Sequence, residues 1–139
     1  MKPLIIFFLL SFSPLIAQDV VIIVNEQNPI TEITRDQIRN FFLKNVRQWP
    51  SGTPVRFFDM SDTREERRYF LRQYVKKTPR EVDLYWIGQK LYSGNSAPLQ
   101  ISSDAMIAGV VSRFPGAIGY VSSAFTEAPG VKKISIKKD

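Results

Sequence analysis

The stretch from Val20 to Val24 reads VVIIV, five consecutive β-branched apolar residues. A strand of this composition has no polar face, so it is stable only where both of its faces are covered. Sheets covered on both faces are typical of α/β proteins, in which helices pack against either side. The run therefore predicts a strand in the interior of a sheet, away from any exposed edge.

Signals for the starts of helices follow this strand at intervals. Thr34 has Gln37 three positions later, and Thr78-Pro79 has Glu81 in the corresponding place, which are the spacings of a capping box. Ser102-Ser103-Asp104 opens a third helix. Its expected apolar positions are Met106, Ile107, Val110, Val111 and Phe114.

Further strands are expected between these helices. Val55 to Phe58 is a short apolar run, and PGAIGYV, from Pro115 to Val121, reads as a turn followed by a strand. VKKISIKK, from Val131 to Lys138, alternates in polarity and predicts a half-exposed edge strand. Gly116 and Gly119 are expected where backbones pack closely. The alternation of strands and helices predicts an α/β fold with a small, mainly parallel sheet flanked by helices.

The first 17 residues, MKPLIIFFLLSFSPLIA, have the layout of a secretory signal peptide. One basic residue precedes an apolar run that is too short for a comfortable membrane span, and Ser13-Pro14 interrupts it before the small residue Ala17. We therefore expect a signal peptide at 1–17, one domain at 18–139 and a periplasmic location; an uncleaved anchor is the alternative.

The composition excludes several kinds of chemistry. The chain contains neither Cys nor His, so it has no disulfide framework, no histidine general base and none of the commonest zinc ligands. No nucleophile–base pair is visible. We expect a protein that is not an enzyme and needs no cofactor. Its formal net charge of +6 suits an anionic ligand or an anionic surface.

One helix start has an unusual composition. MSDTREERRYFL, from Met60 to Leu71, follows the strand at 55–58. Ser61 and Thr63 supply hydroxyl donors, Arg64 supplies a bidentate fork, and a helix start supplies free amides, which together suit an oxyanion. Asp62 opposes an anion because of its charge. The alternative is an ordinary cap, in which Thr63 and Glu66 form a capping box.

Two other kinds of site were weighed. Asp59 and Asp62 are three residues apart, but two carboxylates are too few to hold calcium. The basic stretch REERRYFLRQYVKK has aromatic residues at the spacing of a buried helix face, so nucleic acid is not expected as a partner. Tyr85, Trp86 and Tyr92 are expected in the core or in the wall of a groove, and the turns Ser93-Gly94 and Ser122-Ser123 as plain turns or as neighbours of the anion site.

The order of these motifs resembles a known family. An apolar strand, Asn28-Pro29, a helix, a loop with Trp49, a strand, the Ser61-Asp62-Thr63-Arg64 helix start and then PGAIGYV occur in the same order in the phosphate-binding proteins of ABC transporters, the PstS-like periplasmic solute-binding proteins. The resemblance spans nearly the whole chain after residue 17. It differs from the family pattern at Asp62, where the family has Gly, and in lacking the Arg that precedes this helix start.

The resemblance implies a single lobe of the type II periplasmic-binding-protein fold, whereas the family has two lobes that close on the ligand. It implies an exported protein that binds inorganic phosphate or a similar oxyanion through Ser61, Asp62, Thr63 and Arg64. The partners implied are a membrane transporter or another periplasmic protein. The alternative is a periplasmic interaction module that kept the lobe and lost the ligand, with Asp62 as the mark of that loss.

Overall fold

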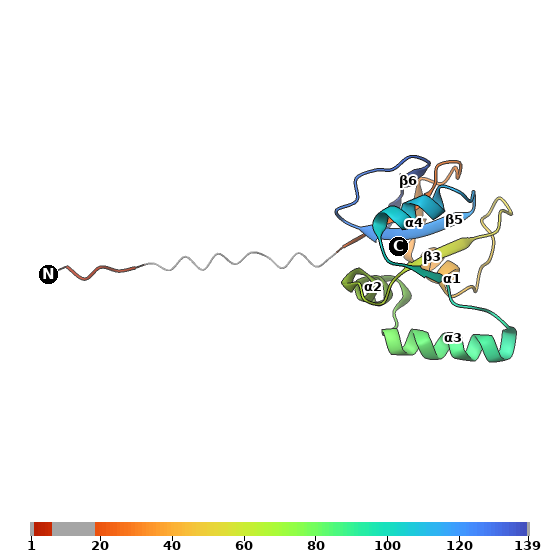
Figure 1. Cartoon of the computed structure of the whole chain (residues 1–139), viewed down its shortest axis with the longest axis horizontal. Helices are drawn as coiled ribbons and strands as arrows, with labels where there is room; N and C mark the ends of the chain where they lie inside the picture. Colours follow the sequence, from red (N-terminus) through yellow and green to blue (C-terminus); the bar gives the residue numbers. More distant parts are fainter. Residues whose placement is uncertain (1, 7–18, 139) are drawn as a thin grey trace.

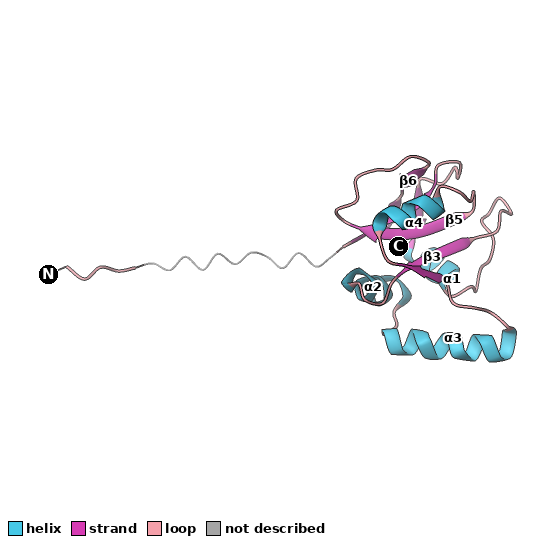
Figure 2. Cartoon of the chain, viewed as in Figure 1, coloured by secondary structure: helices cyan, strands magenta, loops and turns pink. Residues whose placement is uncertain are grey.

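A computed structural model describes residues 2–6 and 19–138 of the chain (Figure 1). The expected signal peptide at 1–17 falls mostly outside the described residues, and its boundary stays a prediction. The described part from residue 19 onward forms one lobe of strands and helices (Figure 2). None of the helices in that part is long and apolar enough to cross a membrane.

The main sheet has five strands in the order β4-β3-β5-β1-β6. Their bounds are Val20–Asn25 for β1, Arg56–Met60 for β3, Leu99–Ile101 for β4, Ala117–Ser122 for β5 and Val131–Lys133 for β6. The VVIIV run forms β1, between β5 and β6, and PGAIGYV supplies the central strand β5. Both interior positions predicted from the sequence are confirmed.

Strand direction is mixed in this sheet. β3 pairs in parallel with β4 and β5, whereas β1 pairs antiparallel with β5 and β6. A second sheet joins β2 (Glu32–Thr34) in parallel with β7 (Ser135–Lys137). Three of the five pairings among the described residues are therefore parallel, and the expected α/β class with helices on the sheet is confirmed. An apolar run demands cover on both faces but leaves strand direction open.

Helices cover both faces of the main sheet. Side chains alternate along a strand, and on β5 a Cβ at Gly119 would lie 3.0 Å from Ile107 of α4 (Asp104–Val111). Tyr120 points the other way and stacks on Phe70 of α2 (Glu65–Phe70) at 3.9 Å between ring centroids. The helices α1 (Arg35–Phe42) and α2, with the π-helical segment η1 (Leu71–Val75), therefore lie opposite α4.

Two helices begin where the sequence predicts. Thr34 caps α1 and Thr78 caps α3 (Pro79–Ser93), and both form complete capping boxes with the expected partners. Helix α3 ends at Gly94, which takes the left-handed conformation with φ of 70°. Figure 1 shows α3 beside the body of the lobe, where Val82 and Trp86 are its buried side chains.

The expected edge strand is two strands. β6 lies at the edge of the main sheet, as predicted, but it stops at Lys133. The amide of Ile134 still donates to Ile22, whereas the amide of Ser135 donates to Thr31. The chain therefore leaves the main sheet at this point and pairs with β2 as β7.

Two apolar residues expected in the core are exposed. Met106 is 58% exposed, because α4 buries Ile107, Ala108 and Val111, and Met106 lies about 100° around the helix from that face. Tyr92 is 91% exposed, at the last turn of α3.

Candidate functional site

The turn from Ser61 to Arg64 joins the carboxyl end of β3 to α2. The amide of Ser61 donates to the carbonyl of Ile101 at 3.0 Å, which fixes the turn to the end of β4. β3 and β4 are parallel, so their carboxyl ends lie at the same edge of the sheet, where α/β proteins commonly bind ligands. The position predicted for the site from strand order is therefore the position that the structure gives to the turn.

The two hydroxyl groups of the turn lie together. Ser61 Oγ and Thr63 Oγ1 are 3.1 Å apart, and the Thr63 amide also lies 3.4 Å from Ser61 Oγ. Ser61 is half-buried and Thr63 is exposed. The turn therefore presents a hydroxyl pair to solvent. Asp62, between them, is exposed, and no hydrogen bond of its side chain is found within the described part of the chain.

The guanidinium of Arg64 is engaged by protein groups. Nε and Nη2 donate to the two carboxylate oxygens of Glu66, both at 3.2 Å, and Nη1 donates to the carbonyl of Ser102 at 3.0 Å. Asp104 adds a carboxylate 3.9 Å from Nη2. The hydrogen bonds to Glu66 raise the pKa of Arg64. Burial alone would raise the pKa of Glu66, but the donors around it, Arg64 first, bring it below its usual value.

The capping box expected from Thr63 and Glu66 does not form. Helix α2 begins one residue later, with Arg64 at the cap position and no capping bond from its side chain. The cause is the Arg64 fork, which occupies both oxygens of Glu66 and keeps that carboxylate away from the amides of the turn. The ordinary-cap interpretation of this turn was therefore wrong in its geometry.

A hollow of about 360 Å³ lies beside the turn. Its lining residues are Asp62, Arg67, Arg68 and Pro79. Of the four residues predicted to bind an anion, only Asp62 faces this hollow, and the two arginines that face it were not among them. Arg67 and Arg68 therefore add positive charge close to the predicted site.

Arg67 also belongs to a buried polar cluster. Its Nε donates to Asp59 Oδ2 at 3.0 Å, and the two residues are 4% and 1% exposed. Tyr120 donates its hydroxyl to Asp59 Oδ1, and the Met60 amide donates to the same oxygen at 2.8 Å. Burial raises the pKa of Asp59, against the opposing effect of Arg67 and the other donors.

The buried pair follows from a pattern visible in the sequence. Asp59 is two residues from Phe57 on a strand, and Arg67 is three residues before Phe70 on a helix, so both fall on apolar faces. A charged residue on an apolar face needs a partner of opposite charge. The pair also rules out Asp59 and Asp62 as joint cation ligands, because Asp59 is fully bonded. Within the described residues, no group of three or more acidic side chains is placed to hold a metal ion.

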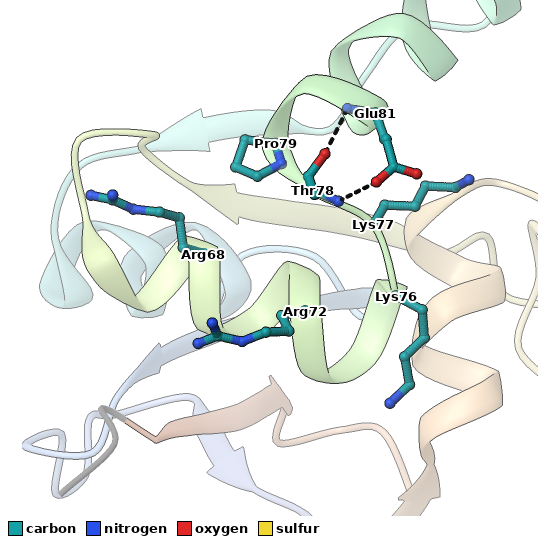
Figure 3. A pocket seen from close by; sticks show the side chains of 7 residues that line it. All are labelled: Arg68, Arg72, Lys76, Lys77, Thr78, Pro79 and Glu81. Atoms are coloured by element: carbon teal, nitrogen blue, oxygen red, sulfur yellow. Dashed lines mark hydrogen bonds between the residues drawn. The ribbon is translucent and has the colours of Figure 1, made fainter. Parts of the chain in front are cut away.

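A second hollow, of about 420 Å³, lies farther along α2 and η1. Figure 3 shows its lining, with Arg68 and Arg72 extending in the same direction from successive turns. The remaining lining residues are Lys76, Lys77, Thr78, Pro79 and Glu81. Glu81 is occupied, since its carboxylate accepts from the Thr78 amide at 3.2 Å. The cations of this hollow therefore leave the region next to the turn positive.

One of the two polar turns considered above is connected to the site. Ser122, at the end of β5, donates its hydroxyl and its amide to Asp104, at 2.6 and 3.0 Å. Asp104 in turn faces Arg64. Ser93 and Gly94 end α3 and serve as its C-terminal cap.

Solved structures with the same fold are proteins of phosphate transport. An ABC-type phosphate transport receptor from Vibrio cholerae matches with a TM-score of 0.66 at 19% identity, over 88% of this chain and 47% of that one. A structure from Clostridium perfringens that contains bound phosphate matches with a TM-score of 0.64 at 18% identity, over 86% and 45%. PstS from Borrelia burgdorferi matches with 0.64 at 14%, over 86% and 47%. At these identities the likeness establishes the fold.

The chain spans about half the length of these proteins. A comparison with curated protein sequences gave no match. The family model described as the PBP superfamily domain matches residues 10–136, which is most of the chain. The protein therefore belongs to the PBP superfamily, of which it presents a single lobe.

Proposed function

We propose that this protein binds inorganic phosphate, or an oxyanion of similar shape, at the turn between β3 and α2. The observation that carries the proposal is the hydroxyl pair of Ser61 and Thr63, at the carboxyl end of a central strand in this fold. The likeness to phosphate transport proteins supports phosphate as the first ligand to test. The positive hollows lined by Arg67, Arg68 and Arg72 would attract it.

We expect weak binding. The turn is open to solvent, and one lobe offers one wall to a ligand that tight pockets enclose on several sides. Arg64 is already paired with Glu66, and Asp62 repels an anion. A dissociation constant in the high-micromolar to millimolar range corresponds to about −4 to −6 kcal/mol.

In the cell, such a protein would act as the exported binding component of a phosphate transporter. Its partners would be a membrane transporter or another periplasmic protein, and its role would be binding rather than catalysis. The absence of His and Cys from the chain is consistent with that role.

A second candidate function is supported by Arg64. Because Glu66 and the Ser102 carbonyl hold its guanidinium, the most obvious anion ligand of the turn is taken. The same arrangement is what a periplasmic interaction module would show if it had kept the lobe and lost its ligand.

Titration with phosphate, followed by NMR of the backbone amides, separates the two. Phosphate is added against chloride at equal ionic strength. We expect saturable shifts at Ser61 and Thr63, and a loss of affinity in the Ser61→Ala variant. Ser51→Ala is the matched control, because Ser51 and Thr53 form a similar exposed hydroxyl pair, 3.2 Å apart, in another turn. Unsaturated shifts, or equal losses in both variants, would favour the interaction module.

A further inference from the structure

A cavity of about 560 Å³ lies against one face of α3 and is distinct from the β3–α2 turn. Four residues of that helix line it at the spacing of a single helix face: Asp83, Trp86, Ile87 and Lys90. The opposite wall comes from Asp59 of β3, Arg67 of α2 and the segment 95–97 with Gln100. Ser61, Thr63 and Arg64 do not contribute to the lining. The volume falls within the range of about 300–1,000 Å³ that is usual for small-molecule sites.

Arg67 offers this cavity a cation with unused donors. The residue is 4% exposed, yet only its Nε has a protein acceptor, the carboxylate of Asp59. Among residues 19–138, no oxygen accepts from its Nη1 or Nη2. A buried guanidinium with free donors is costly unless a ligand or water completes its hydrogen bonds.

Trp86 offers a second unused donor. Trp86 is 7% exposed and lines the cavity. Its indole N–H has no acceptor, and it is the only buried side-chain polar atom without a partner in the described part of the chain. The other tryptophan, Trp49, shows the usual arrangement, since its indole donates to the carbonyl of Gly116 at 2.9 Å. An unpartnered buried N–H in a cavity wall points to an acceptor that enters from outside.

The remaining lining residues define the chemistry of the ligand. Lys90 adds a second cation, held by Ser96 Oγ at 3.1 Å. The charge of Asp59 is consumed by three donors. Asp83 is exposed, so it acts on the cavity as a screened charge. Ile87 and the Trp86 ring supply apolar surface.

We propose that this cavity binds a small organic anion, with its oxyanion group held by Arg67 and Lys90 and its apolar body against Trp86 and Ile87. Carboxylates and phosphate monoesters share the required chemistry, because both present several acceptors to a guanidinium. Phenyl phosphate and benzoate are therefore the two probes.

The two tryptophans make the test direct. In ¹⁵N-labelled protein they give two indole N–H signals, and a Trp86→Phe variant identifies which is which. We expect phenyl phosphate, benzoate or both to move the Trp86 signal saturably and to leave the Trp49 signal in place; the probe that binds more tightly identifies the preferred head group. Phenol, which lacks the charge, should have no saturable effect. Equal movement of both indole signals, or an equal response to phenol, would refute the proposal.

Two substitutions of opposite sign in the same cavity complete the test. Lys90→Gln removes a cation and should weaken binding of the better probe about twofold to fivefold, whereas Asp83→Asn removes a rim anion and should tighten it by a similar factor. Both positions are on the surface of α3, so the fold is preserved. If neither variant changes the affinity, or if Asp83→Asn weakens it, the proposed anion site is wrong. Orthophosphate binding at Ser61 and Thr63 is read from different signals, so each proposal can fail independently.

Discussion

Arg67 donates from Nε to Oδ2 of Asp59 across 3.0 Å, inside the lobe. The helix α2 supplies the cation and the strand β3 supplies the anion, so the pair joins the two elements on either side of the β3–α2 turn. Breaking a buried pair by removing one partner leaves an uncompensated charge, which is more costly than losing an exposed pair.

Substitution of Arg67 by Met should strongly destabilise the protein. The long apolar side chain of Met keeps much of the volume, but Asp59 loses its counter-ion. We expect the free energy of unfolding to fall by about 3–5 kcal/mol in a urea titration. The double variant with Asp59→Asn should recover part of this loss, because no buried charge then remains. A double variant less stable than the single one would contradict this account.

The pH dependence of the Arg67→Met variant should differ from that of the wild-type protein. Burial already raises the pKa of Asp59, and Arg67 opposes that rise, so its removal raises the folded-state pKa further. A carboxyl group whose folded pKa exceeds its unfolded value of about 3.9 stabilises the fold below that value. That stability is lost as the pH rises through the folded pKa. Unfolding of the variant should therefore show a shallower deficit in acid than at neutral pH.

Replacement of Asp62 should strengthen phosphate binding. Asp62→Gly removes a like charge and frees the backbone next to the hydroxyl pair, and Asp62→Asn removes the charge alone. An exposed charge contributes about 0.2–1 kcal/mol, so we expect affinity to rise about 1.4-fold to fivefold in calorimetry. Added salt should weaken phosphate binding. If Asp62→Gly has no effect, the turn does not bind phosphate and the interaction-module function is favoured.

Release of Arg64 should also strengthen phosphate binding. Glu66→Gln removes the carboxylate that receives two of the Arg64 donors, so the fork can turn to a ligand. The gain should disappear in a double variant with Arg64→Ala, and Arg64→Ala alone should weaken binding. Calorimetric titration of the three variants with phosphate measures these differences.

The same carboxylate should stabilise the fold in a pH-dependent way. Because the folded-state pKa of Glu66 is lowered, its contribution is present above its unfolded pKa of about 4.3 and is lost as the pH falls through the lower folded value. Wild-type protein and Glu66→Gln should therefore converge in stability in acid. A constant difference at every pH would show that Glu66 acts through packing alone.

Gly116 should tolerate no larger residue. A Cβ at this position would lie 1.8 Å from the carbonyl oxygen of Pro54, so the backbone would have to move. We expect Gly116→Ala to lower the free energy of unfolding by about 1–3 kcal/mol. Gly88→Ala, in the middle of α3, meets nothing within 4 Å and should raise stability by about 0.5–1 kcal/mol. Thermal unfolding of both variants compares them directly.

Features that depend on neighbouring residues were predictable from the sequence. Thr34 and Thr78 cap their helices because the partner lies three residues away, and β1 is interior because its own composition demands it. The tight packing expected at Gly116 is likewise confirmed. These interactions are set within a few residues, so one sequence contains the information for them.

Features that depend on tertiary contacts were not predictable. Arg64 lies at the predicted turn, but its acceptor in Ser102 is 38 residues away and its availability follows from that contact. Arg67 could have been recognised as buried from its helical phase, although its partner could not. Met106 shows the same limit, because the face that a short helix buries is chosen by the sheet beneath it.

The π-helical segment at Leu71–Val75 has a consequence for the lengths of related chains. A π-turn holds one more residue than an α-turn of similar height, so this segment is where the rod can lose or gain a residue at least cost to its flanks. Loss of one residue would restore the α form and rotate all that follows by about 100° relative to Phe70. Lys76, now in the left-handed conformation, would then move toward the buried position of Val75. The bearing of α3, and with it the cavity beneath that helix, is therefore set by a single residue of chain length.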